Sequence, residues 1–355
     1  MTSDEDRRFM RACLRFALRH QGLTDDNPSV GTLIVRDGVV VGRGVTARGG
    51  RPHAEPIALR QAGELARGAT AYVTLEPCAH SARTPPCAKA LIAGGVKRVV
   101  TAYRDPDERV DGKGHALLGE AGIEVDAGCE SERAASDLAG YLKRKTVGRP
   151  LVTLKLAMTE DGFLGRRGEE TPITGAEARA QVHMMRARAD AILVGRGTVQ
   201  ADDPELTVRL PGLEDRSPVR YLAASANDLK GSRLERSARR VRTYRIGERP
   251  QPDEPTGWHR ADIENGRIDL GDLLSSLGED DPDLACSNLL VEGGAALATS
   301  FLDEGLVDRI VRFRAPHKLS DGIASPIAPL ATPDGFRRTD ERVYGRDVAT
   351  FFERI

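Results

Sequence analysis

The stretch that decides the fold contains Pro52-His53-Ala54-Glu55, then Thr74-Leu75-Glu76-Pro77-Cys78, and then Arg83-Thr84-Pro85-Pro86-Cys87. It offers one imidazole and two thiolates, a ligand set that suits zinc, which prefers four tetrahedral ligands. Three protein ligands leave one position for water, whose pKa the metal lowers from about 15.7 toward about 7. The sequence therefore predicts a catalytic Zn²⁺ site formed by His53, Cys78 and Cys87.

Glu55 is the candidate proton carrier of this site. It follows His53 closely, at the start of a helix predicted from about Ala54 to Ala66. From that position its carboxylate can lie beside the metal without binding it, and can act as general acid and base. A His-x-Glu motif followed by Pro-Cys and a further cysteine is typical of zinc nucleobase deaminases. We therefore predict a hydrolytic deamination that releases ammonia.

The same residues are also compatible with a role that is not catalytic. A structural zinc site would need a fourth protein ligand, which His80 could provide. Alternatively, the cysteines could be buried thiols that only fill the core. Neither alternative accounts for Glu55 or for the proline before Cys78.

Composition limits the class of protein. A chain of 355 residues, 30% charged and 40% apolar, predicts two globular domains of about 150–200 residues each. The absence of a long apolar run and of a signal-like N-terminus predicts a cytoplasmic protein with no membrane partner, and five cysteines fit a reducing compartment better than a disulfide framework. The net charge of −1 argues against a deaminase that acts on nucleic acid.

The first half predicts an α/β domain. Its elements follow the order strand, strand, helix, strand, helix, strand, which is typical of a sheet with helices against its faces. A hairpin is expected at Arg36-Asp37-Gly38. The other expected elements are helices over Asp4–Arg19, Cys87–Ile92, Ala116–Ala121 and Ser131–Leu142, and strands over Ala71–Leu75, Arg98–Ala102 and Ile123–Val125.

The segment Thr146-Val147-Gly148-Arg149-Pro150 is the best candidate linker, and it divides the chain into residues 1–147 and 148–355. After it, buried strands are expected over Leu151–Ala157, Ala191–Val194 and Asn288–Val291. Glu292-Gly293-Gly294 then begins a helix whose N-terminal amides could bind phosphate, although a tight strand-to-helix turn explains the same glycines. Between about 212 and 283 the sequence is polar, and only short strands are expected, over Arg220–Ala223 and Arg240–Tyr244.

Together these motifs resemble the bifunctional riboflavin-biosynthesis deaminase/reductase family over nearly the whole chain. In the first half the resemblance is carried by Asn27-Pro28-x-Val30-Gly31, by the motif around His53, and by the long spacing between Cys78 and Cys87. It implies a cytidine-deaminase-like three-layer α/β/α domain over residues 1–147 that deaminates a pyrimidine. Asn27 and the loop Arg83–Pro86 then become candidates for contacts with the pyrimidine.

The second half resembles the family's dihydrofolate-reductase-like α/β domain. The resemblance is carried by Lys155-Leu156-Ala157-Met158, Ile173-Thr174-Gly175, Thr198-Val199-x-Ala201-Asp202-Asp203-Pro204 and Leu206-Thr207-Val208-Arg209, and it implies NADPH-dependent reduction. Lys155 and Glu292 would be catalytic, and Arg186 and Arg209 would hold a sugar phosphate. The other implied substrate contacts are Glu170, Pro172, Leu206 and Glu292, and the implied cofactor contacts are Ala157, Thr198, Asp202, Ser225, Gly294, Ala295, Ala296, Leu297, Ala298, Thr299 and Ser300.

The resemblance therefore implies two successive reactions in riboflavin biosynthesis. A diamino-pyrimidinone ribosylamine phosphate would be deaminated with Zn²⁺, and its ribosyl chain would then be reduced by NADPH to a ribityl chain. A homo-oligomer, a dimer or a tetramer, is expected, with small phosphorylated pyrimidines as the partners. The alternative is an active deaminase whose C-terminal domain only binds substrate or dimerises, because Glu170, Pro172 and Ala224 depart from the family pattern.

Overall fold

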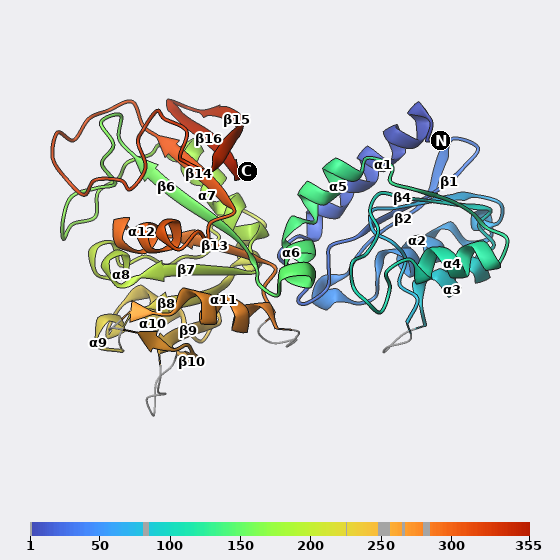
Figure 1. Cartoon of the computed structure of the whole chain (residues 1–355), viewed down its shortest axis with the longest axis horizontal. Helices are drawn as coiled ribbons and strands as arrows, with labels where there is room; N and C mark the ends of the chain where they lie inside the picture. Colours follow the sequence, from blue (N-terminus) through green and yellow to red (C-terminus); the bar gives the residue numbers. More distant parts are fainter. Residues whose placement is uncertain (1, 81–84, 225, 248–255, 265–266, 280–284) are drawn as a thin grey trace. The chain divides into compact units, whose positions relative to one another are not determined.

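The computed structural model describes residues 2–80, 85–224, 226–247, 256–264, 267–279 and 285–355. The chain forms two compact units, and their boundary lies between Gly148 and Arg149. In Figure 1 each unit is a sheet with helices packed against it. Within the described ranges, no helix is both long enough and apolar enough to cross a membrane.

The first unit is organised around a five-stranded sheet in the order β2-β1-β3-β4-β5. The first two strands form an antiparallel hairpin, and β1 also pairs antiparallel with β3. From β3 onward the strands run parallel. The bounds are β1 (Gly31–Arg36), β2 (Val39–Val45), β3 (Thr70–Val73), β4 (Arg98–Thr101) and β5 (Glu124–Ala127).

The hairpin predicted at the first turn is confirmed. Asp37 and Gly38 connect β1 to β2 with φ values of 50° and 74°. A two-residue hairpin turn of this kind needs positive φ at both positions, which Asp-Gly provides at low cost.

Helices cover both faces of this sheet, so the expected three-layer α/β/α arrangement is confirmed. Successive side chains of a strand point to opposite faces, and each face accordingly packs against a different set of helices. Ile34, Ala71, Val73 and Val99 pack with α2 (Ala54–Ala62) and α3 (Cys87–Ala93), whereas Leu33, Val35, Tyr72 and Val100 pack with α1 (Asp4–Ala17).

Helix α2 lies directly on strand β2 because two glycines leave room for it. A Cβ atom at Gly42 would lie 2.2 Å from the carbonyl oxygen of Ala58, and one at Gly44 would lie 2.0 Å from that of Ala54. Real Cβ atoms do not approach oxygen so closely. These glycines therefore set the position of the helix that begins next to His53.

The C-terminal part of the first unit contains two helices where the sequence predicts one. The expected helix over Ser131–Leu142 is divided into α5 (Ser131–Asp137) and α6 (Ala139–Val147). The break is at Leu138, whose φ of −97° and ψ of 4° leave the helical region while its side chain is buried in the core. Helix α4 (Lys113–Glu120) begins earlier than expected.

The second unit is organised around a nine-stranded sheet in the order β10-β9-β8-β7-β13-β6-β14-β16-β15. The strands from β10 to β14 are parallel, and β16 and β15 continue the sheet in antiparallel pairing. Because β13 lies between β7 and β6, the carboxyl ends of these three strands lie side by side. The bounds are β6 (Leu151–Met158), β7 (Ala191–Gly195), β8 (Val219–Ala223), β9 (Thr243–Gly247), β10 (Gly257–Arg260), β13 (Asn288–Glu292), β14 (Arg309–Arg314), β15 (Phe336–Tyr344) and β16 (Asp347–Arg354).

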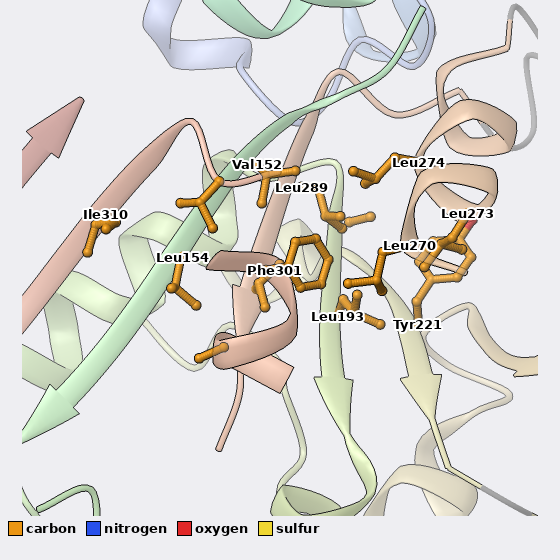
Figure 2. Packing of buried hydrophobic residues seen from close by; sticks show 14 of the residues in the cluster. Val152, Leu154, Leu193, Tyr221, Leu270, Leu273, Leu274, Leu289, Phe301 and Ile310 are labelled. Carbon is orange, nitrogen blue, oxygen red and sulfur yellow. The ribbon is translucent and has the colours of Figure 1, made fainter. Parts of the chain in front are cut away.

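The core of this unit lies on both faces of the sheet. Figure 2 shows one face, where leucines of α11 (Leu270–Gly278) and Phe301 of α12 (Ala295–Asp303) pack on Val152 and Leu193 of the central strands. The opposite face is covered by α7 (Ala176–Arg188), α8 (Arg196–Asp202) and α10 (Arg233–Ser237).

The expectation of only short strands between residues 212 and 283 is wrong, because this region also contains α11. Leu270, Leu273, Leu274 and Leu277 are all buried on one side of that helix. Asp269 begins the helix by accepting the amide of Asp272. The many charged and glycine residues nearby hide this short apolar repeat when only composition is considered.

Candidate active sites

Three elements of the first unit bring the expected metal ligands together. His53 is the N-cap residue of α2, Cys87 is the first residue of α3, and Cys78 lies in the turn after β3. Their ligand atoms lie within 4.8 Å of one another, and His53 Nδ1 is 3.3 Å from Cys87 Sγ and 3.7 Å from Cys78 Sγ. Tetrahedral zinc with ordinary bond lengths separates nitrogen from sulfur by roughly 3.6 Å. The three residues therefore fit a zinc ion.

Within the described residues, the cluster has three ligand side chains, which leaves a fourth position for water. Among the described residues, it contains His53, Cys78 and Cys87 and not His80, so the structure does not support the closed structural site that His80 would complete. Cys78 Sγ accepts the backbone amide of Cys87 at 3.3 Å. Hydrogen bonding by the Cys87 side chain, together with His53, holds the pKa of Cys78 below its ordinary value. A thiolate is the form of cysteine that binds metal.

Glu55 lies next to this cluster and is 3% exposed. Its Oε2 atom has no hydrogen-bond partner within the described part of the chain, and burial raises the pKa of this carboxyl. An unpaired buried oxygen costs free energy, and it is expected where a ligand or water completes the site. Glu55 is thus placed to exchange protons with a molecule in the cleft.

The cleft in front of Glu55 has a volume of about 130 Å³. Asn27, an expected pyrimidine contact, lines it, whereas Arg83 and Thr84 of the expected pyrimidine-binding loop lie outside the described residues. Side chains that the sequence motifs do not single out also line it: Asp105, Asp107, Arg109, Tyr141 and Lys145.

Asp105 is a buried member of this additional group. Burial raises its pKa to about 6, and its carboxylate accepts the Tyr141 hydroxyl at 2.9 Å. Asp107 pairs with Arg109 at 2.5 Å and lies 3.4 Å from Lys145. The sequence does contain a signal for the two aspartates, because they follow β4, whose carboxyl end neighbours that of β3 in the parallel part of the sheet.

Glu76 holds the turn that carries Cys78. Its carboxylate accepts the backbone amides of Gly112 and Gly114 at 3.0 Å each and of His115 at 3.2 Å, all at the start of α4. A Cβ at Gly114 would lie 2.0 Å from the Pro77 carbonyl oxygen, so α4 packs directly against this turn. Glu76 therefore fixes the turn that carries Cys78 against the start of α4.

In the second unit, Lys155 and Glu292 occupy paired positions on β6 and β13. Lys155 Nζ lies 3.9 Å from Glu292 Oε2. Arg186 of α7 binds the same carboxylate at two points, Nε to Oε1 at 2.6 Å and Nη2 to Oε2 at 2.9 Å. Burial lowers the pKa of Lys155. The structure brings together the three residues that the sequence assigns to proton transfer and substrate binding.

The other expected substrate contacts differ in their exposure. Leu206 is buried, whereas Arg209 is half exposed and pairs with Glu205 at 3.2 Å. Glu170 and Pro172 are exposed. Partial loss of solvent raises the pKa of Asp202, whose side chain is still exposed, and the negative charge of Glu170 adds to that increase.

Most of the expected cofactor contacts lie in α12 or at its N-cap. Gly294 is the N-cap residue of that helix, and its amide donates to Thr198 Oγ1 at 3.1 Å. The first turn of α12 contains no acidic residue, and free helix N-terminal amides suit a phosphate. Ala298 is fully buried in the core, while Ser225 lies outside the described residues. The remaining expected contacts are Ala157 at the end of β6, Asp202 at the end of α8, and Ala295, Ala296, Leu297, Thr299 and Ser300 in α12.

Two protein-family models match this chain. The model of the cytidine and deoxycytidylate deaminase zinc-binding region matches residues 3–103, and that of the RibD C-terminal domain matches residues 150–327. The riboflavin biosynthesis proteins RibD of Aquifex aeolicus and Escherichia coli are each 38% identical to this chain. The matches cover 100% and 97% of this chain, and 100% and 98% of those proteins. The chain belongs to the RibD family.

Solved RibD structures have the same fold over the whole chain. Acinetobacter baumannii RibD, form 1, has a TM-score of 0.87 at 35% identity and covers 99% of both chains. A deaminase/reductase from Thermotoga maritima has a TM-score of 0.86 at 30% identity, again with 99% of both chains covered. The expected deaminase-like and reductase folds are therefore confirmed.

Membership of the RibD family also decides the class of enzyme. The chain is a bifunctional deaminase and reductase of riboflavin biosynthesis that uses zinc and NADPH. None of these matches supports the alternative in which the C-terminal domain has lost its activity.

Proposed function

We propose that this chain acts on the two substrates named for the Thermotoga maritima protein. That protein is described as a diaminohydroxyphosphoribosylaminopyrimidine deaminase and a 5-amino-6-(5-phosphoribosylamino)uracil reductase. The observation that carries the proposal is the buried, unpaired Oε2 of Glu55 beside the His53, Cys78 and Cys87 cluster. The first unit would deaminate the pyrimidine, and the second would reduce the sugar chain.

In the deaminase reaction, His53, Cys78 and Cys87 hold zinc. When bound, the ion supplies Lewis acidity that lowers the pKa of water toward neutrality. Glu55 accepts the proton of the attacking water and delivers it to the departing amino group. Asn27 and Asp105, which line the same cleft, orient the pyrimidine by hydrogen bonds. Burial of Glu55 excludes bulk water from this proton transfer.

In the reductase reaction, the second unit holds the cofactor at the start of α12 and beside Thr198, Asp202 and Ala157. When bound, NADPH supplies a hydride. Lys155 donates the balancing proton to the ring-opened sugar, and its low pKa, a result of burial, favours that transfer. Glu292, held by Arg186 at two points, fixes the position of Lys155.

Arg209 is the proposed ligand of the sugar phosphate. Its side chain is 53% exposed, and a guanidinium group suits bidentate binding of phosphate. The positive charge of Arg186, which is less exposed than Arg209, also attracts the sugar phosphate in the proposed site. Leu206, Glu170 and Pro172 complete the proposed substrate site.

The test supplies purified protein with each of the two substrates in turn and measures its zinc content. We expect ammonia release from the first substrate, and oxidation of NADPH, followed by its near-ultraviolet absorbance, only with the deaminated second substrate. Deamination without NADPH oxidation would contradict the proposed reductase step. Ammonia release that persists after complete removal of zinc would contradict the proposed deaminase site.

We further propose that the enzyme is cytoplasmic and forms a homo-oligomer. Five free cysteines, two of them expected zinc ligands, support a reducing compartment. Fractionation of the cell would test the location, and sedimentation of the purified protein would distinguish a dimer from a tetramer.

A further inference from the structure

Arg220, in the middle of the second unit, is completely buried although it carries a charge. It lies on β8, and its guanidinium donates hydrogen bonds to neutral oxygens. Nε and Nη2 donate to Thr243 Oγ1 at 2.9 and 2.6 Å, and Nη1 donates to Ser237 Oγ at 2.8 Å. Nη2 also reaches the carbonyl oxygens of Val241 and Leu234 at 3.2 and 3.4 Å.

The sixth contact of this guanidinium goes to the proposed substrate region. Nη1 donates to the backbone carbonyl oxygen of Glu205 at 2.8 Å. Within the described part of the chain, no carboxylate forms an ion pair with this guanidinium, and burying a cation in this way is costly. Burial lowers the pKa of Arg220 to about 10, although the charge of Glu205 opposes this decrease. Because burying this charge costs free energy, we expect the Arg220 guanidinium to bind a backbone segment that a neutral side chain would bind less firmly.

The segment that Arg220 holds is a strained turn. Asp203 and Leu206, on either side of Pro204-Glu205, have φ values of 37° and 55°. Residues other than glycine seldom adopt positive φ. Such conformations persist when surrounding contacts fix them, and they concentrate at functional sites.

A second set of contacts fixes the other end of this turn. Thr207 O accepts hydrogen bonds from Arg186 Nη1 at 3.2 Å and from the His183 ring at 3.1 Å. The same Arg186 binds Glu292. The turn is thus held from one side by Arg220 and from the other by the residues of the proposed reductase site, and Arg209 lies just beyond it.

We propose that Arg220 is a positioning residue of the reductase reaction: by binding the Glu205 carbonyl it fixes the turn 203–207 and thereby presents Arg209 to the phosphate of the substrate. This inference rests on the proposed role of Arg209. Arg220 touches neither substrate nor cofactor itself, and it acts only through the backbone of the turn.

The test compares Arg220→Lys and Arg220→Met with a matched control, Arg312→Lys. Arg312 is another buried arginine of the same unit, and its Nη1 atom donates to two backbone carbonyls, of Ala328 and Ala331, at 2.7 Å each. We expect Arg220→Lys to raise the KM for the phosphorylated substrate by about tenfold, and Arg220→Met by more, since small misplacements of binding groups can cost about 100-fold.

The same measurements separate positioning from general loosening of the fold. The KM for NADPH should change by less than about twofold, and deamination by the same chain should be unchanged. Arg312→Lys should leave both KM values unchanged. The inference is overturned if folded Arg220 variants keep the parental KM for the substrate, or if Arg312→Lys raises it equally.

If neither Arg220 variant folds, Thr243→Val tests the inference instead. This substitution removes the hydroxyl oxygen that accepts hydrogen bonds from Nε and Nη2 of Arg220. A KM for the substrate raised by about threefold supports the inference, and an unchanged KM overturns it. Arg209→Gln tests the proposed function separately. If it leaves the KM unchanged, the phosphate site is wrong; if it raises the KM while Arg220→Lys does not, only the role of Arg220 is wrong.

Discussion

Arg186 and Glu292 form a buried two-point ion pair, with Nε and Nη2 of the arginine 2.6 and 2.9 Å from the two carboxylate oxygens. Burial alone would raise the pKa of Glu292, but the charge of Arg186 outweighs burial and lowers it. Glu292 is therefore ionised at neutral pH, which makes it an orienting group for Lys155 rather than a proton donor.

Glu292→Gln should separate the two activities. The substitution leaves the buried charge of Arg186 without its partner, which typically costs about 3–5 kcal/mol, and it removes the group that holds Lys155. We expect kcat/KM for reduction to fall at least about 100-fold while ammonia release is unchanged. NADPH oxidation and urea unfolding would measure the two effects. Glu353→Gln, which breaks a partly exposed pair with Arg309, is the control and should cost less than about 1 kcal/mol.

Glu55→Gln should abolish proton transfer but retain zinc. Because general acid and base catalysis contributes about 10²–10⁴-fold, we expect kcat for deamination to fall by that factor. Cys78→Ser should lose both zinc and deamination. Metal analysis of the purified variants and an ammonia assay would check both results. Full activity of Glu55→Gln would show that another group carries the proton.

Glu76→Gln should weaken zinc binding although Glu76 is not a ligand. The carboxylate accepts three amides at the start of α4, and hydrogen bonds to a charged acceptor contribute about 1.5–3 kcal/mol each. We expect zinc affinity, measured by competition with a chelator, to fall about 10–100-fold, as for other supports of metal ligands. Glu124→Gln, an exposed carboxylate on β5, should leave the affinity unchanged.

The Asp6 carboxylate should make the free energy of unfolding of the first unit depend on pH. Its carboxylate binds Arg98 at 2.8 and 3.1 Å and accepts the Tyr72 hydroxyl, and the bonds from Arg98 hold its pKa well below the ordinary range. A carboxyl with a lowered pKa stabilises the fold above its unfolded pKa of about 3.9, and this contribution is lost as pH falls toward the folded pKa.

Asp6→Asn should consequently lower the free energy of unfolding by roughly 2 kcal/mol at neutral pH, and by less at pH values below about 3. Urea unfolding at several pH values, followed by a signal from the first unit, would measure the difference. A loss that is independent of pH would mean that Asp6 acts through packing rather than charge.

The clustering of His53, Cys78 and Cys87 could be predicted from sequence because the expected chemistry depends on short motifs. The N-cap position of His53 and the start of α3 at Cys87 are local features, so the motif nearly fixes their geometry. The hairpin at Asp37-Gly38 was predictable for the same reason. In each case a few adjacent residues specify both the backbone and the chemistry.

Other parts of the sites depend on contacts between distant segments. Arg186 is expected from sequence to bind a phosphate, and only the structure shows that Glu292 already binds its guanidinium at two points. Asp105 enters the deaminase cleft together with Tyr141, which comes from α6. The role of Arg220 depends on its burial, and a basic residue on a short strand gives no sign of it in the sequence.

Gly42 and Gly44 constrain the deaminase domain although neither residue has a side chain that could take part in catalysis. Any side chain there would collide with the backbone of α2 and move the helix that begins next to His53. Among random variants of this gene, changes at these glycines should therefore be recovered as strains that accumulate the undeaminated intermediate while their reductase remains intact. Mutations that abolish deamination should accordingly occur at more positions than those of the residues that contact zinc or pyrimidine.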